Sequence, residues 1–263
     1  MPSFLDIPND VTLVLTSSID VNGMPSSSRP DPLLRELDYQ QTLVYYVTGH
    51  PDIRRILFIE NSGWPLDRLK DAARARNPYG KEVEFISLNC NQFPRELGKS
   101  YGEMLLLDEG LAQSQLVGKA PYIAKITGRI YVDNVTRLLR SVRRPFDFMV
   151  DLRDHGLYDM LGLNWCGRSG DARFFVSSVR FYDEVLRGKY AILNEGNHKF
   201  IERLLYDIAK DPRYADRTLR RFPVEAHYRG LAGHLDKQYD SSRERLKRGL
   251  RGSLRRLAPW LHV

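Results

Sequence analysis

The sequence predicts an α/β domain in which helices flank a mixed, mostly parallel β-sheet. Strand-like apolar runs alternate with helix-like segments through the first half of the chain. A chain of 263 residues, 42% of them hydrophobic, can fill the core of one large domain. Its apolar runs, such as Val11–Leu15, are far shorter than the roughly 20 residues that span a bilayer. These observations exclude a wholly disordered chain and predict no membrane-spanning helix.

Each element of the first half follows from the spacing of its apolar residues. A strand is expected where a short apolar run is bounded by turn residues, and a helix where apolar residues recur every three or four positions. The expected strands are Val11–Leu15, Arg54–Ile59, Val83–Leu88 and Ile123–Val132. The expected helices are about Leu33–Gly49, Asp67–Arg76, Glu103–Leu111 and Thr136–Val142.

The pattern changes beyond Pro145. Two strands, Phe146–Leu152 and Ala172–Ser178, are expected without a full crossover helix between them, followed by a helix over about His198–Lys210. We expect one continuous domain over residues 1–240, with a nucleotide-binding half (1–144) and a mixed half that could shape a substrate (145–240). Residues 241–263 form a separate basic tail.

The net charge of +7 comes mainly from this tail. Residues 241–263 hold seven basic residues against one acidic residue, and five leucines recur every three or four positions, ending near Trp260. This pattern is typical of an amphipathic helix on an anionic membrane surface. A helix packed on the body or on a partner remains open, as does a nucleic-acid arm, although base-stacking aromatic residues are scarce. We expect a cytoplasmic protein, peripheral on the inner face of the membrane, that binds no nucleic acid. The two cysteines predict neither a disulfide framework nor a metal site.

The segment Gly98–Glu103 follows a predicted strand and opens a predicted helix. Backbone N–H groups and the helix dipole favour an anion there, and Lys99 adds a full positive charge. We therefore assign Lys99, Tyr101, Gly102 and Glu103 to the phosphate-binding side of a ligand site. A glycine-containing loop with no ligand is the alternative.

A second candidate is Thr127-Gly128-Arg129, inside the last strand of the first half. A glycine in an apolar strand indicates close approach to the backbone, and an arginine can bind a phosphate through two parallel hydrogen bonds. A strand bulge with a surface arginine is the alternative.

Three further groups supply candidate residues for the acceptor side and for closure of the site. Asp151, Asp154, Asp171 and Arg173 lie near strand ends, where carboxylates suit a metal-bound diphosphate or an acceptor hydroxyl but are also common turn formers. His198, Glu202 and Tyr206 are spaced to share one edge of a helix, where Glu202 could be a general base or merely part of a solvated edge. The last group could close over a diphosphate or serve only as a hinge: Gly230, Gly233, His234 and Lys237.

Seven segments occur in a characteristic order between about Val11 and Tyr239. They are Leu13–Thr16, Glu60–Gly63, Gly98–Glu103, Lys125–Arg129, Asp171–Phe175, the helix around Glu202, and Gly230–Tyr239. This ordered set resembles a group of bacterial glycosyltransferases found with capsule and O-antigen assembly systems. The resemblance implies a GT-A-like enzyme whose Rossmann-like half holds a nucleotide sugar. The D-x-D motif of such enzymes is missing, and Thr127-Gly128-Arg129 lies about where it would be.

The resemblance implies transfer of a sugar from a nucleotide-sugar donor to a growing cell-surface glycan, such as capsule, O-antigen or lipopolysaccharide. Lys99, Arg129 and the Gly230–Lys237 loop would hold the diphosphate, and Glu202 or Asp171 would act as base on a glycan or lipid-linked acceptor. Because the D-x-D motif is missing, the sequence leaves open whether the enzyme uses a divalent cation, Mg²⁺ or Mn²⁺, as a cofactor. Two other functions stay open: a non-catalytic basic module at a membrane or on nucleic acid, and a sugar nucleotidyltransferase.

Overall fold

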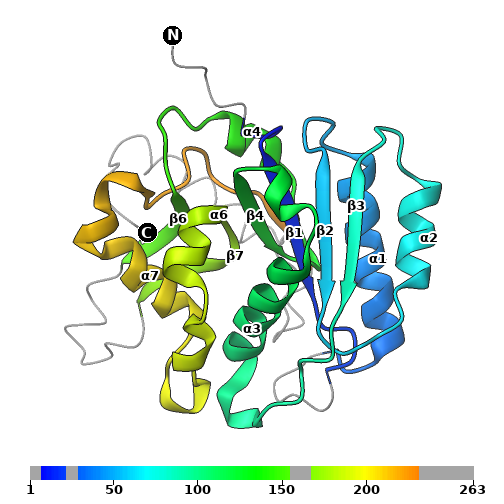
Figure 1. Ribbon diagram of the computed structural model, residues 1–263, viewed down its shortest axis with the longest axis horizontal. Coiled ribbons are helices and arrows are strands. Elements are labelled where there is room, and N and C mark those ends of the chain that lie inside the picture. The colour runs from blue at the N-terminus through cyan, green and yellow to red at the C-terminus, as the bar shows by residue number, and fades with distance from the viewer. Residues whose placement is uncertain (1–6, 22–28, 155–166, 231–263) are drawn as a thin grey trace.

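The computed structural model describes residues 7–21, 29–154 and 167–230, and the structural statements below concern these residues (Figure 1). Its strands are β1 (Val11–Ser17), β2 (Arg55–Glu60), β3 (Glu82–Ser87), β4 (Tyr122–Thr127), β5 (Ile130–Val132), β6 (Phe148–Asp154), β7 (Arg168–Ser178), β8 (Thr218–Leu219) and β9 (Tyr228–Gly230). Within the described chain, seven of these strands form one sheet in the order β3-β2-β1-β4-β7-β6-β8, and β5 pairs with β9 in a second, small sheet.

The large sheet is mixed but mostly parallel. Strands β1, β2, β3 and β4 pair in parallel, as do β6 and β8, whereas β7 is antiparallel to both of its neighbours, β4 and β6. The expected α/β class, with a mixed, mostly parallel Rossmann-type sheet between helices, is confirmed. The expected C-terminal amphipathic helix lies outside the described residues. Because β1, β2 and β4 point the same way, their carboxyl ends meet at one edge of the sheet.

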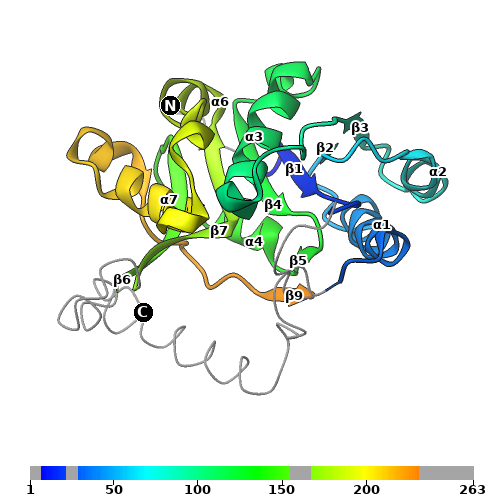
Figure 2. The same ribbon diagram turned by 90° about the horizontal axis from the view of Figure 1, so that it is seen from below.

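Helices cover both faces of the sheet (Figures 1 and 2). The helices α1 (Pro32–Thr48), α2 (Asp67–Ala75) and α4 (Val135–Arg140) lie on one face together with β5 and β9. The helices α3 (Gly98–Gln113), α6 (Val179–Phe181) and α7 (Ile201–Lys210) lie on the other face, and a π-helical turn continues α6 over Tyr182–Leu186. Short 3₁₀ turns occupy Arg95–Leu97, Val117–Lys119, Lys189–Ile192, Glu195–Asn197 and Pro212–Arg217.

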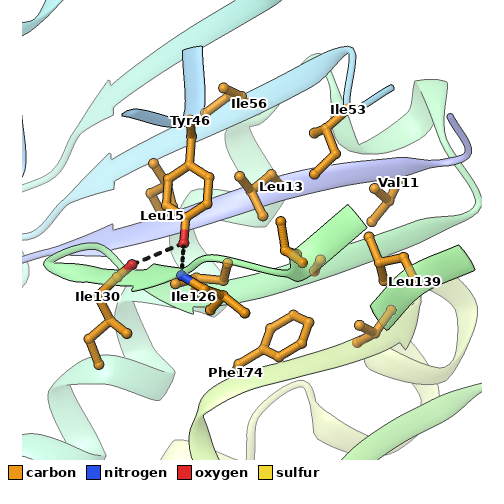
Figure 3. Close-up of a cluster of buried hydrophobic side chains, with 14 of the residues drawn as sticks. Val11, Leu13, Leu15, Tyr46, Ile53, Ile56, Ile126, Ile130, Leu139 and Phe174 are labelled. Carbon is orange, nitrogen blue, oxygen red and sulfur yellow. Dashed lines mark hydrogen bonds between the residues drawn. The ribbon is translucent and has the colours of Figure 1, made fainter. Parts of the chain in front are cut away.

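The two helical layers enclose separate apolar cores because side chains alternate along each strand. In β1, Leu13 and Leu15 pack toward α1 and α4, and Val14 packs toward α3. On the α1 side, the buried hydroxyl of Tyr46 accepts a hydrogen bond from Val132 N at 2.8 Å and donates to Ile130 O at 3.0 Å (Figure 3). These two hydrogen bonds connect α1 to β5, the strand that follows β4 in the sequence.

Local signals explain where several helices begin and end. Asp31 caps α1 by accepting a hydrogen bond from Leu33 N at 2.9 Å, Pro32 occupies its first turn, and Gly49 follows its last residue. The expected apolar stripe of α7 is confirmed, since Ile201, Leu204, Leu205 and Ile208 are all buried.

The structure corrects several expected boundaries. The helix expected over Glu103–Leu111 begins earlier, at Gly98, so Lys99 and Tyr101 lie inside α3. The strand expected over Ile123–Val132 is interrupted, because Gly128 and Arg129 form a turn between β4 and β5. Gly128 N donates to Thr16 O at 2.8 Å, and a β-carbon at Gly128 would lie 2.6 Å from that oxygen, so only glycine fits. The helix expected from about His198 begins instead at Ile201. His198 lies before it in a left-handed conformation with φ of 58°.

Candidate active site

A pocket opens at the edge where β1, β2 and β4 end. Its cavity is about 190 Å³, room for far more than a single water molecule. Ligands of open α/β sheets bind at this position, outside the carboxyl ends of the strands. The polar residues around the pocket come from β1, α1, the segments after β2 and β3, α3, and the β4–β5 turn: Thr16, Arg35, Tyr39, Asn61, Asn91, Lys99, Glu103, Thr127 and Arg129.

Three cationic side chains converge on this pocket: Arg35, Lys99 and Arg129. Arg35 is 4% exposed and is held by hydrogen bonds from Nε and Nη2 to Ser18 O, at 2.7 and 2.5 Å. Burial lowers the pKa of Lys99, and the charges of Arg35 and Arg129 lower it further against the opposing effect of Glu195. The repulsion within this group of three favours binding of an anion among them.

Arg129 is a buried cation with few compensating contacts. It is 8% exposed, and its buried Nε has no hydrogen-bond partner among the described residues. A carboxylate oxygen of Asp38 lies 4.0 Å from its Nη1, and its guanidinium lies 5.7 Å from the centre of the Tyr39 ring. A buried donor without a partner is costly unless a ligand supplies the acceptor. The sequence indicated Lys99 and Arg129 but not Arg35, because a single arginine in an amphipathic helix resembles a surface residue.

The start of α3 already holds an anion from the protein itself. Ser100 donates from its backbone N and from Oγ to Glu195 Oε1, at 2.8 and 2.6 Å. A β-carbon at Gly98 would lie 2.5 Å from the Glu195 carboxyl group, and one at Gly102 would lie 2.6 Å from the ring of Phe93. The two glycines therefore permit close packing, and Tyr101 packs edge-on against the ring of Tyr190. Lys99 is the member of this segment that brings positive charge to the pocket.

Glu103 is the acidic residue lining the pocket among the residues that the structure describes. Its Oε1 forms an ion pair at 2.5 Å with Nζ of Lys125, a fully buried lysine on β4. Thr16 and Thr127, at the ends of β1 and β4, also donate to Oε1, at 3.1 and 3.3 Å. The ends of two neighbouring strands thus fix this carboxylate beside the three cations.

The two candidate bases differ in their surroundings. Glu202, in the first turn of α7, is accessible to solvent. Partial desolvation of its carboxyl by the surrounding protein raises its pKa, and the negative charges of Glu103, Glu195 and Asp171 raise it further. Burial alone would raise the pKa of Asp171, but the two parallel hydrogen bonds from Arg173, at 2.6 and 2.8 Å, help to lower it to about 2. Of the two, Glu202 has the free, more basic carboxylate that a general base requires.

The remaining acceptor-side candidates do not form one cluster with Glu202. Asp151 accepts a hydrogen bond from Phe222 N at 3.1 Å. Asp154 accepts from Tyr206 Oη at 2.7 Å and lies 3.0 Å from Nζ of Lys210, and these contacts lower its pKa although burial opposes them. His198 is exposed and lies outside α7, so it shares no helix edge with Glu202 and Tyr206.

The end of the described chain returns to the pocket. Gly230, the last residue of β9, pairs with Ile130, and a β-carbon there would lie 2.5 Å from Arg129 O. The chain after Gly230 therefore starts beside Arg129. The other residues of the expected closing loop, Gly233, His234 and Lys237, lie outside the described residues, as does the tail 241–263.

Comparison with known proteins gives likenesses of structure. No protein-family model and no curated protein matches the sequence. The chain is similar to core-mannan synthase A from Aspergillus fumigatus in an Mn/GDP form, with 10% identity, a TM-score of 0.43, and coverage of 82% of this chain and 76% of that one. It is also similar to the galactosyltransferase LgtC in complex with donor and acceptor sugar analogues, with 13% identity, a TM-score of 0.42, and coverage of 78% of this chain and 82% of that one. A third similar structure is a cytidylyltransferase from Leptospira borgpetersenii serovar Hardjo-bovis, with 7% identity, a TM-score of 0.41, and coverage of 80% of this chain and 74% of that one.

The pocket does not have the donor set of a divalent-cation site. No cluster of three or more His, Cys, Asp or Glu side chains that could hold a metal ion occurs among the described residues. Mg²⁺ and Mn²⁺ prefer carboxylate oxygens, and the carboxylate of Glu103 is already paired with Lys125. Two or more free carboxylates would be needed where Arg35, Lys99 and Arg129 lie. We therefore derive no step through a metal ion.

Proposed function

We propose that this protein is a glycosyltransferase that moves a sugar from a nucleotide-sugar donor to a hydroxyl group of a growing glycan. The observation that carries the proposal is the convergence of Arg35, Lys99 and Arg129 on one pocket at the carboxyl edge of the sheet. Three cations around one pocket fit the two phosphates of a nucleoside diphosphate. Glu202, a carboxylate with a raised pKa, supplies the base such a transfer needs.

In this proposal, the cations stabilise the charge that develops on the leaving diphosphate as its bond to the sugar breaks. Arg129 offers its buried Nε, which has no partner among the described residues, and Lys99 offers its ammonium, while Arg35 is fixed by the carbonyl of Ser18. Asn61 lines the same pocket, and its buried Oδ1 has no partner in the described structure, so it is available to the nucleoside. Glu202 removes the proton of the acceptor hydroxyl that attacks the sugar.

The acceptor and the location in the cell belong to the same proposal. The ordered motifs resemble those of bacterial enzymes of capsule, O-antigen or lipopolysaccharide synthesis, which supports a growing surface glycan or a lipid-linked acceptor. None of the helices in the described part of the chain is long and apolar enough to cross a membrane. The basic tail 241–263 would hold the enzyme on the anionic inner face of the membrane, beside a lipid-linked acceptor.

The test is a thermal-stabilisation screen of the full chain against nucleoside diphosphates and nucleotide sugars, followed by product analysis with each stabilising nucleotide sugar. A glycosyltransferase releases a nucleoside diphosphate or monophosphate, whereas a nucleotidyltransferase releases pyrophosphate. Neither nucleotide binding nor transfer would be seen for a non-catalytic module. Stabilisation that Arg129→Ala does not weaken would show that the nucleotide binds elsewhere.

A further inference from the structure

The surroundings of Glu103 are unusual for a residue of a phosphate-binding pocket. The other charged groups lining the described pocket are cations, and a carboxylate among them repels a diphosphate. Yet Glu103 is held in place firmly, since Lys125 and the hydroxyls of Thr16 and Thr127 all contact one oxygen, Oε1. A group that opposes phosphate binding and is fixed by three donors must serve another part of the ligand.

Lys125 is the group that positions Glu103. Its side chain is fully buried, and its ammonium also donates to Thr127 Oγ1 at 3.0 Å and to Ala172 O at 2.5 Å. Acceptors from β4 and β7 therefore fix the ammonium, and the ammonium fixes Oε1 of Glu103. Such an arrangement leaves the carboxylate little freedom to turn away from the pocket.

The second oxygen of Glu103 stays available. The side chain is 24% exposed, and no hydrogen bond of the described structure reaches Oε2. An ionised carboxylate only accepts hydrogen bonds, so its natural partners are hydroxyl groups. Glu103 lines the pocket together with the three cations, and its charge acts on the carboxyl of Glu202. A sugar attached to a diphosphate held by the cations would therefore lie beside Glu103.

We infer that Glu103 binds hydroxyl groups of the transferred sugar and thereby selects a neutral sugar over an acidic one. The inference rests on the proposed function and names the class of donor. A neutral hexose places hydroxyl groups against Oε2, and hydrogen bonds to an ionised acceptor are strong. A sugar that carries its own carboxylate, such as a uronic acid, would meet the like charge of Glu103. Glu103 thus acts on donor choice, and Lys125 is its positioning residue.

The test compares bare nucleotides with their sugar conjugates by isothermal titration calorimetry on the full chain. UDP, GDP and CDP are titrated first, followed by glucose, mannose and glucuronic acid conjugates of each nucleotide that binds. In the wild-type protein, at least one neutral conjugate should bind tighter than the glucuronic acid conjugate by about tenfold or more, the scale of one charged hydrogen bond. Glu103→Gln should reduce that ratio to within about threefold while affinity for the bare nucleotide stays equal or rises.

A second pair of variants separates donor selection from folding. In Lys125→Met with Glu103→Gln, no unpaired ammonium is buried, so the protein should fold and should still have lost the selectivity. Glu109→Gln, at an exposed position of the same helix, is the matched control and should leave both affinities and the selectivity unchanged.

The outcomes distinguish this inference from the proposed function. If the wild-type protein binds none of the three nucleotides, the proposed function fails, and the inference fails with it. If a nucleotide binds but the neutral-to-acidic ratio is the same in wild type and Glu103→Gln, only the inference is overturned. A wild-type preference for the glucuronic acid conjugate would overturn it as well.

Discussion

Replacing Arg129 with alanine removes a buried cation of the pocket that has few compensating contacts. Its Nε has no hydrogen-bond partner in the described structure, and the nearest carboxylate, that of Asp38, is 4.0 Å away. Hydrogen bonds of a charged group contribute about 1.5–3 kcal/mol. At 1.4 kcal/mol for each factor of ten, the dissociation constant of a nucleoside diphosphate should rise about 10- to 150-fold.

The free energy of unfolding should change little, because the substitution breaks no close ion pair. It also removes a charge that repels Arg35 and Lys99, which offsets the lost packing on Tyr39. Calorimetric titration and a melting curve on the same samples separate the two effects. Arg74→Ala is the matched control, since Arg74 is 80% exposed and its ion pair in the described structure is with the exposed Asp71.

Lys99 gives the same experiment a pH axis. Its pKa lies below the ordinary value of a lysine, chiefly because of burial, and a bound diphosphate would raise it again. The lysine must be protonated to bind, so nucleotide affinity should fall as the pH rises through this lowered pKa, and Lys99→Ala should flatten that part of the profile. Unchanged affinity in both Arg129→Ala and Lys99→Ala would refute the assignment of the pocket.

Further predictions concern the base, a buried ion pair, the tail and the metal. Glu202→Gln should lower turnover by about 10²–10⁴ without changing the melting temperature or the nucleotide affinity, and surviving turnover would move the base to Asp171. Because the pKa of Glu202 is raised, wild-type activity should decline on acidification at a higher pH than an ordinary glutamate would give. The pKa of Asp171 is lowered to about 2, so its pair with Arg173 contributes about 2 kcal/mol of stability above pH 4. Acid-unfolding curves should show this stability being lost as the pH falls from 4 to 2, and Asp171→Asn should not show that loss. The full chain should sediment with anionic liposomes in a salt-sensitive way, whereas a chain ending at Asp240 should not; equal sedimentation would contradict the role of the tail. Nucleotide affinity should persist in EDTA, and its loss there would reveal a metal site.

The elements that the sequence predicts well are those set by local periodicity. The apolar run of β1 and the stripe of α7 specify a buried strand and an amphipathic helix whatever surrounds them. The turn at Gly128 is harder to predict from the sequence, since a glycine inside an apolar strand-like segment fits a strand bulge as well as a turn. What decides between them is the carbonyl of Thr16, more than one hundred positions earlier in the chain.

The site itself depended on contacts that no local pattern shows. Arg35 turns into the pocket because Ser18 O binds its guanidinium, and the start of α3 is occupied because Glu195 reaches Ser100. Each contact joins segments whose separation in the sequence carries no signal. Lys99 and Arg129 could be predicted because each lies beside a glycine, Lys99 at the start of a helix and Arg129 just after a strand.

The position of β1 in the sheet also has a consequence during synthesis. β1 leaves the ribosome before β2 and β4, yet it lies between them in the sheet, with Thr16 beside Ile59 on one side and Thr127 on the other. The nascent chain therefore carries an unpaired apolar strand edge until β4 has been made, and such an edge invites aggregation. The pocket joins α1 and β1 to Arg129, which is made after them. A nucleotide bound there holds these earlier and later segments together and slows their separation, so the substrate would also preserve the fold of the enzyme.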